Sequence, residues 1–283
     1  MTTSDPTALR AERRALRQQQ RRRRVVAVVV LLLLGVAVMA GAIVYASRDQ
    51  PPPPEPLRTI SLTVPEGYSR EQTAELAREA GLRGDYLKAS EGHEGFLFPD
   101  TFELIEGAPA SDLVQLQLED FKRRLAGVEM GYARAKNLTE HDVVTIASMV
   151  EEEAQLDSER KLIAAVIYNR LREGIPLGID ATVRFATGNY DQPLTESELA
   201  VDSPSNTRVN AGLPPGPISS PGLASLEAAA HPAQVDYLYY VVQPGTCGEH
   251  SFSSSAAEFE ADVAAYDEAR EAAGGESPDT CGE

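Results

Sequence analysis

The segment Thr145-Ile-Ala-Ser-Met-Val-Glu-Glu-Glu-Ala154 joins an apolar helical face directly to three carboxylates. Its apolar residues recur at helical spacing, at Ile146, Ala147, Val150 and Ala154. This pattern predicts a helix packed against a core. At about 100° per residue, Glu152 falls opposite the apolar face, whereas Glu151 and Glu153 lie at its two edges. Burial raises the pKa of a carboxyl group at such an edge, as a general acid requires. The spacing therefore excludes Glu152 as the general acid and leaves Glu151 and Glu153 as candidates. The alternative interpretation is that all three glutamates form a solvated acidic patch without a catalytic role.

The segments on either side of this helix mix helical and strand patterns. Capping boxes at Ser69-x-x-Gln72 and Thr195-x-x-Glu198 mark two helix starts, and the first of these helices should end at Gly81. Further helices are expected at 111–127, 139–154, 157–174, 220–231 and 256–272, with strands at 60–64 and 237–242. Because helices and strands do not alternate strictly, we predict an α+β fold, or an irregular α/β one.

Two loops have unusual compositions. Residues 210–222 contain four prolines and three glycines, so this loop has few backbone states and could hold a binding surface at little ordering cost. A rigid surface connection is the alternative. The turn from Gly95 to Phe102 is rich in aromatic residues, which could stack on sugar rings or belong to the core.

Val25 to Ala46 is a run of 22 residues without a charge, long enough to cross a bilayer as one helix. Arg21 to Arg24 precede it, so the positive-inside rule places the N-terminal tail, residues 1–24, in the cytoplasm. A cleaved signal peptide would have a shorter apolar core, about 7–15 residues. We therefore expect a single-pass anchor in the cell membrane, a Pro-rich spacer at 47–58, and an extracytoplasmic remainder.

The charge is distributed unevenly. Residues 1–24 hold eight arginines and two acidic residues, so the rest of the chain carries 18 basic and 41 acidic residues, a net charge of −23. Such an acidic domain is a poor partner for nucleic acid. Four histidines, and two cysteines without a second ligand at zinc spacing, disfavour a metal centre. We expect no metal and no cofactor.

The two cysteines fit an extracytoplasmic location. Cys247 and Cys281 lie in similar contexts, each followed by Gly-Glu. An even cysteine count in an oxidising compartment predicts a disulfide. This bond would tie the acidic tail, residues 271–283, to the loop after the 237–242 strand. Two free thiols would be relevant only if the topology were inverted.

An ordered series of motifs carries a family resemblance. It comprises Phe96-Leu-Phe-Pro-Asp-Thr101, Ala147-Ser-Met-Val-Glu-Glu-Glu153, Ser158-Glu-Arg160, Val166-Ile-Tyr-Asn-Arg-Leu171, Ile179-Asp-Ala-Thr-Val183, Ser203-Pro-Ser-Asn-Thr207, Gly212-Leu-Pro-Pro-Gly-Pro-Ile-Ser219, Pro221-Gly-Leu-Ala-Ser-Leu226, His231-Pro and Tyr237-Leu-Tyr-Tyr240. Over roughly residues 60–265 the chain resembles the YceG-like family of endolytic murein transglycosylases. A single membrane anchor with an extracytoplasmic catalytic domain agrees with this family.

The resemblance implies a lyase acting on peptidoglycan. Members of the family cleave the β-1,4 bond between N-acetylmuramic acid (MurNAc) and N-acetylglucosamine (GlcNAc), leaving a 1,6-anhydro-MurNAc end. One carboxyl group can protonate the glycosidic oxygen and then accept a proton from the C6 hydroxyl that closes on C1. Because the attacking group belongs to the substrate, the second carboxylate of an ordinary glycosidase is not required.

The resemblance also assigns roles to residues. The catalytic glutamate of the family maps onto Glu153, and the charge of Glu151 is expected to raise its pKa further. Four polar residues match family segments that could bind the sugars: Asp180, Thr182, Asn206 and His250. For each of them, and for Glu151, a structural hydrogen bond is the alternative to substrate binding.

This chain departs from the family pattern in its N-terminal part. The family normally has a longer LysM-like module before the catalytic domain, so we expect a LysM-like strand-helix remnant at 59–92 and the YceG-like domain at 93–270. Gly178 and Ala181 replace the usual Gln and Pro, and Ser205 replaces a Tyr. The shortened module motivates a second hypothesis, a catalytically weak scaffold for cell-wall synthases. Hydrolysis to a reducing end is a third, with Asp180 as the candidate base.

Overall fold

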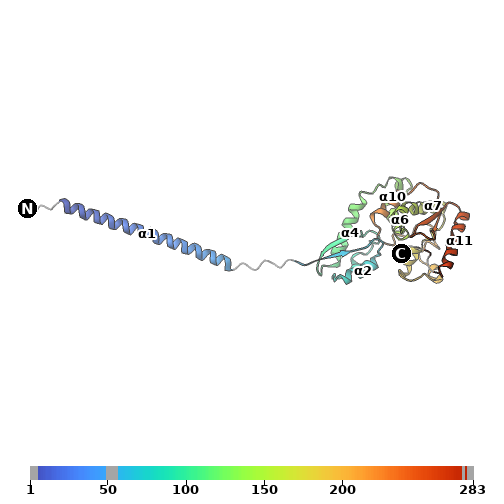
Figure 1. Cartoon of the computed structure of the whole chain (residues 1–283), viewed down its shortest axis with the longest axis horizontal. Coiled ribbons are helices and arrows are strands. Elements are labelled where there is room, and N and C mark those ends of the chain that lie inside the picture. The colour runs from blue at the N-terminus through green and yellow to red at the C-terminus, as the bar shows by residue number, and fades with distance from the viewer. Residues whose placement is uncertain (1–5, 49–56, 276–277, 279–283) are drawn as a thin grey trace, which may run out of the picture. The chain divides into compact units, whose positions relative to one another are not determined.

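The computed structural model describes residues 6–48, 57–275 and 278, and the chain divides into two units, 1–56 and 57–283. The described part of the first unit is the helix α1 (Pro6–Arg48), drawn in blue in Figure 1. Its segment Leu16–Ser47 is long and apolar enough to cross a membrane, and its most apolar window is entirely exposed. Helix α1 is therefore compatible with a single-pass anchor. It begins well before Val25, because the arginines and glutamines ahead of the apolar run are good helix formers.

The second unit begins with a strand-helix-helix-strand arrangement. Strands β1 (Thr59–Thr63) and β2 (Thr101–Ile105) pair antiparallel, with Thr59 opposite Ile105. Helices α2 (Arg70–Glu79) and α3 (Tyr86–Ala89) lie between them in sequence. Strand β1 therefore pairs across the expected boundary at residue 92, because β2 satisfies its backbone hydrogen bonds.

A hydrophobic cluster joins this arrangement to helix α4 (Ala110–Leu125). Alternate residues of the two strands, such as Leu62 and Phe102, are buried against Leu113 and Val114 of α4. The strands thus show the period of two that a sheet with one buried face requires. The cluster explains why this strand-helix-helix-strand arrangement extends beyond residue 92, because a two-stranded sheet has marginal stability unless a helix covers it.

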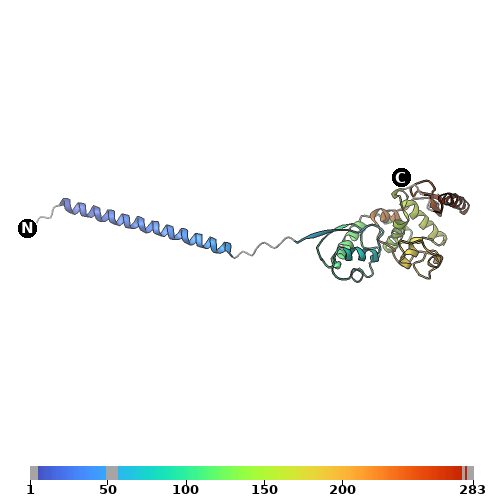
Figure 2. The same ribbon diagram turned by 60° about the horizontal axis from the view of Figure 1, so that its bottom comes forward.

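Three helices form the centre of the second unit: α6 (Glu140–Glu153), α7 (Arg160–Glu173) and α10 (Leu223–Ala230). Figure 1 shows them together at the middle of this unit, and Figure 2 shows the same group after rotation. Residues 143–150 of α6 are all buried. A capping box between Thr139 and Asp142 fixes the start of α6. The predicted helix at 139–154 is therefore confirmed to within one residue at each end.

The remaining elements surround these helices: α5 (Gly131–Ala135), α8 (Asp180–Thr187), α9 (Glu196–Leu199), β3 (Tyr239–Val242), β4 (His250–Ser253) and α11 (Ala256–Ala272). Strands β3 and β4 pair antiparallel, with Tyr239 opposite Ser253. The sequence did not predict α8 or β4. Strand β4 reads His-Ser-Phe-Ser, which has no apolar run, and it is a strand because β3 supplies its hydrogen-bond partners. The α+β prediction is confirmed by this mixture of helices and small antiparallel sheets.

The Pro/Gly-rich loop at 210–222 lies along α6. The Ile218 amide donates to the Ser148 hydroxyl on α6 at 3.0 Å. Ser220 forms a two-way backbone bridge: its carbonyl accepts from Gly67 at 2.9 Å and its amide donates to Tyr68 at 3.0 Å. Helix α10 consequently begins at Leu223 rather than Ser220, because Ser220 is held in this bridge. The loop connects α6 to the turn that precedes α2.

Candidate active site

Helix α6 ends with the three glutamates, and each has a different environment. The helix stops at Glu153 because Ala154 turns to an extended conformation, with φ −84° and ψ 108°. The last carboxylates therefore lie at the exit of a helix whose body is buried in the core. A helix C-terminus carries partial negative charge, which is unfavourable for an ionised carboxylate. Each of these groups needs either a cation or a proton.

Glu151 is neutralised by a cation. Its Oε1 lies 2.9 Å from Nη1 of Arg160, and both side chains are nearly buried. Its Oε2 accepts a hydrogen bond from the Gly222 amide, at the start of α10, at 2.9 Å. The exposed side chain of Glu66 lies over Gly222. Glu151 thus holds the starts of α7 and α10 to the end of α6.

Glu153 faces a phenol instead of a cation. The Tyr240 hydroxyl on β3 donates to Oε2 of Glu153 at 2.9 Å. Glu153 is half-buried, and burial raises its pKa, while the hydrogen bond from Tyr240 lowers it. Burial, and then the neighbouring charge of Glu153, raise the pKa of Tyr240 well above its usual value, so the phenol stays a neutral donor. The result is a carboxyl group oriented through one oxygen and inclined to keep its proton.

Charged groups around Glu153 modulate this pKa. Asp180, at the start of α8, raises it, whereas His250 and Arg170 lower it. The carboxylate acting on Glu153 is therefore Asp180. We expected Glu151 in this role; its carboxylate is paired with Arg160, and it is not among the main influences on the pKa of Glu153. Asp180 is itself half-exposed and accepts from Nη1 of Arg208 at 2.6 Å.

His250 is fixed by a second carboxylate. Its Nδ1 lies 2.7 Å from Oε2 of Glu159, and its backbone amide donates to Oε1 of the same residue at 2.9 Å. A carboxylate only accepts, so Nδ1 carries the proton and donates. The ring of His250 meets that of Tyr240 edge-on at a centroid distance of 5.3 Å. Glu159 thus fixes the His250 ring, this ring packs against Tyr240, and Tyr240 donates a hydrogen bond to Glu153.

Two predicted sugar-binding residues have structural roles. Thr182 and Asn206 are completely buried. The Thr182 hydroxyl lies 3.0 Å from that of Thr207, and the Asn206 amide donates to the carbonyls of Leu199 and Val201 at 3.1 and 3.0 Å. Thr182 and Thr207 thereby support the segment that carries Asp180, and Asn206 supports residues 199–201. The predicted role of Thr182 and Asn206 in binding sugars stays a prediction.

Glu152 also has a raised pKa. Its side chain is exposed, and the turn at Gly67 closely approaches its carboxylate. Partial desolvation, together with the charges of Glu151 and Glu153, raises the pKa of Glu152 to about 7, and a hydrogen bond from Ser219 lowers it. Periodicity placed Glu152 on the solvent side and set it aside, but it could not show that the turn at Gly67 approaches that side. Because both glutamates have raised pKa values, a Glu152 variant is the matched control for a Glu153 variant.

A groove of about 610 Å³ lies between α2 and α8, lined by residues that include Glu71, Phe185 and Tyr190. Tyr190 is half-buried, and the charge of Glu152 contributes to its raised pKa. The groove therefore comes close to the end of α6. The aromatic turn at 95–102 does not take part: Phe96 packs edge-on against Phe121 in the core at 5.2 Å.

Some site residues escaped the sequence analysis, and one predicted feature lies outside the structure. Tyr240, Arg170 and Glu159 were present in the motifs, but only the fold shows that they face Glu153 or His250.

The predicted disulfide involves Cys281, which lies outside the described residues, and stays a prediction. Among the residues that the structure describes, no cluster of three or more His, Cys, Asp or Glu side chains could hold a metal ion.

The YceG-like family matches residues 42–265 of this chain. The match covers well over half of the 283 residues. The chain therefore belongs to the YceG-like family.

Relatives and a solved structure agree with this membership. The chain is 39% identical over 152 residues to the endolytic murein transglycosylase of Bacillus subtilis (strain 168), covering 53% of this chain and 42% of that protein. It is 30% identical over 223 residues to that of Streptococcus pneumoniae (strain ATCC BAA-255 / R6), covering 64% and 40%. The crystal structure of a YceG-like protein from Listeria monocytogenes matches with a TM-score of 0.66 and 29% identity, covering 71% and 75%. The chain thus spans less than half the length of these two curated relatives.

Proposed function

We propose that this protein is an endolytic lytic transglycosylase of peptidoglycan. It would cleave the β-1,4 bond between MurNAc and GlcNAc in nascent glycan strands and leave 1,6-anhydro-MurNAc ends. Family membership and the names of the two relatives support the substrate class. The observation that carries the chemistry is the pair formed by Glu153 and Tyr240, in which burial raises the pKa of a carboxyl group held by a neutral donor.

In the proposed mechanism Glu153 acts twice. Its protonated carboxyl group donates the proton to the glycosidic oxygen while the bond from that oxygen to C1 of MurNAc breaks. The C6 hydroxyl of the same MurNAc then forms a bond to C1 and gives its proton to the Glu153 carboxylate. No water is consumed, and Glu153 returns to its starting state. Tyr240 occupies Oε2, which leaves Oε1 for both proton transfers.

The positive charge that develops at C1 needs stabilisation. The half-exposed carboxylate of Asp180 and the ionised Glu153 supply negative potential there. Preorganised charges of this kind act more strongly in a site partly shielded from water. The groove between α2 and α8 is the proposed path of the glycan, with Tyr190 as a stacking surface. The strand-helix-helix-strand arrangement would be the LysM-like remnant, contributing α2 as one wall of this groove.

The proposed location follows from α1. Arg21 to Arg24 precede the apolar segment, so residues 57–283 would face the periplasm or cell wall. The substrate lies on that side of the membrane.

The test is a product analysis with the full chain in detergent. Uncross-linked glycan strands are incubated with wild type, Glu153→Gln and Glu152→Gln, and the products are identified by mass spectrometry. We expect anhydro ends from wild type and Glu152→Gln, and none from Glu153→Gln. Reducing ends would show a hydrolase. If Glu152→Gln alone abolishes cleavage, the general acid is Glu152, and if no protein cleaves, the scaffold hypothesis replaces ours.

A further inference from the structure

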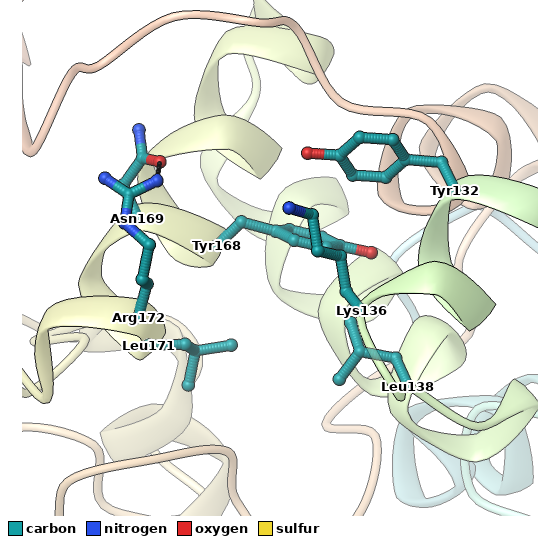
Figure 3. A pocket seen from close by; sticks show the side chains of 7 residues that line it. All are labelled: Tyr132, Lys136, Leu138, Tyr168, Asn169, Leu171 and Arg172. Atoms are coloured by element: carbon teal, nitrogen blue, oxygen red, sulfur yellow. Dashed lines mark hydrogen bonds between the residues drawn. The ribbon is translucent and has the colours of Figure 1, made fainter.

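A separate pocket of about 360 Å³ opens between α5 and the C-terminal half of α7. Figure 3 shows its lining: Tyr132 and Lys136 on one side, Asn169 and Arg172 on the other, and Tyr168 between them. Leu138 and Leu171 complete the wall. Neither Glu153 nor any side chain that shifts its pKa lines the pocket. Its volume lies in the range of small-molecule sites.

The charge of this pocket is opposite to that of the domain. Two cations, Lys136 and Arg172, line it, although residues 25–283 carry a net charge of −23. Lys136 forms no salt bridge with any residue that the structure describes, and its Nζ lies 5.5 Å from the ring centroid of Tyr132. Such a cation is available to an anion entering the pocket.

Arg172 is held in place with donors to spare. Its Nη1 donates to Oδ1 of Asn169 at 3.0 Å and its Nε to Glu173 at 3.1 Å. The Asn169 side chain is itself fixed, because its amide donates to the carbonyls of Val235 and Tyr237. Nη2 of Arg172 donates to no group in the described part of the chain. A guanidinium oriented in this way is suited to a carboxylate.

The two tyrosines differ in what they can offer. The Tyr168 hydroxyl donates to the Ala229 carbonyl at 2.8 Å, so this residue presents only its ring. The Tyr132 ring lies 5.9 Å from it, and in Figure 3 its hydroxyl points across the pocket. That hydroxyl has no hydrogen-bond partner among the described residues. The pocket thus combines an apolar platform with a free hydroxyl and two cations.

We propose that this pocket binds the free carboxylate of a peptide branch of peptidoglycan, between Lys136 and Arg172, with the peptide lying on the tyrosine rings. This inference rests on the proposed function, since peptidoglycan carries short peptides with free carboxylates on its MurNAc residues. Neutral sugars would not require two cations. The pocket borders the start of α6 at Leu138 and Glu153 ends that helix, a separation of about 20 Å along 14 residues. A peptide of five residues spans about 17 Å when extended, which is shorter than this separation. The branch that reaches the pocket would therefore belong to a neighbouring MurNAc of the strand rather than to the MurNAc at Glu153.

A binding titration tests the pocket without depending on cleavage. The full chain in detergent is titrated by calorimetry with the tetrapeptide L-Ala-γ-D-Glu-L-Lys-D-Ala, with its doubly amidated form, and with tetra-alanine. We expect the free acid to bind, amidation to weaken binding at least tenfold, and tetra-alanine to bind at least tenfold more weakly. Equal binding of the amidated form would overturn the carboxylate site. Equal binding of tetra-alanine would overturn the stem peptide as its source and favour a protein terminus.

Variants assign the binding to this pocket. Lys136→Gln with Arg172→Gln should weaken the tetrapeptide at least tenfold, and Tyr132→Phe should weaken it less. The matched control is Arg134→Gln, an exposed cation of α5 that pairs with Glu140 outside the pocket. Equal affinity of the double variant and wild type would refute the proposal. Failure of the proposed function appears differently: wild type would bind the tetrapeptide but cleave no glycan.

Discussion

Glu151 and Glu153 lie two residues apart at the end of α6, yet their carboxylates have different partners on the two sides of the helix. On one side, Glu151 meets Arg160 and the Gly222 amide and is held as an anion. On the other, Glu153 meets Tyr240, and burial together with Asp180 raises its pKa. The residue type and helix are the same. The partner supplied by the rest of the fold makes one carboxylate a structural tie and the other a candidate acid.

The strongest test of this comparison is Glu153→Gln. It should reduce kcat/KM by about 10³-fold, within the range for loss of a general acid. The melting temperature should stay close to that of wild type, because a neutral amide still accepts from Tyr240. Activity on glycan strands and thermal unfolding are measured on the same preparations. A large loss of stability would mean that Glu153 is a structural tie as well, and the contrast with Glu151 would disappear.

Glu151→Gln should have the opposite effect. It leaves the guanidinium of Arg160 nearly buried without its main partner, and breaking a buried pair costs about 3 kcal/mol. Urea unfolding followed by circular dichroism measures the free energy of unfolding. The control is Glu75→Gln, which removes an exposed pair with Arg78 on α2 and should change stability little. If both variants unfold alike, the tie at Glu151 does not stabilise the helix ends.

Tyr240→Phe tests the partner of Glu153 rather than the carboxylate itself. The phenol lowers the pKa of Glu153, so its loss should raise that pKa further. An acid works in its protonated form, so the decline of activity at high pH should move to higher pH, by about one unit, with about tenfold lower kcat. A pH profile of kcat/KM provides the measurement. An unchanged profile with a lower rate would limit Tyr240 to a packing role.

The smallest expected effect is on stability and concerns Glu94. This half-buried residue follows α3 in sequence, and its carboxyl group lies against the first backbone amide of α2. Burial, then the charge of Glu71, raises its pKa to about 7 from the usual 4.5. The folded state therefore binds more protons than the unfolded state between these values, and stability falls as pH rises from about 4.5 to about 7. Glu94→Gln should remove this slope and stabilise the protein at pH 8 by on the order of 1 kcal/mol, discounted for partial exposure.

Unfolding at pH 5 and pH 8 checks this expectation, with exposed Glu91→Gln as the control. A variant that keeps the wild-type difference between the two pH values would contradict it. Glu151 and Glu153 lie at the C-terminal end of α6, whereas Glu94 lies at the N-terminal end of α2, where the Arg70 amide donates to its Oε1 at 3.2 Å. The result therefore extends the comparison of carboxylates to the opposite end of a helix.

Much of the fold follows from local patterns. The capping boxes at Ser69, Thr139 and Thr195 all appear in the structure, because each side chain needs only the amide three residues ahead. Elements whose identity depends on distant partners were missed. Strand β4 depends on β3, and the start of α10 depends on the bridge between Ser220 and residues 67–68.

The sequence alone determined that α6 is a core helix ending in carboxylates, that one N-terminal helix could span a membrane, and that the motifs belong to the YceG-like family. These follow from spacing, length and the order of motifs, which are properties of a linear chain. Only the tertiary structure decided which glutamate receives a cation and which a phenol, and that Thr182 and Asn206 are buried supports. A pKa depends on burial and on charges a few ångströms away in space, and the folded chain brings these together from positions as far apart as Glu153 and Tyr240.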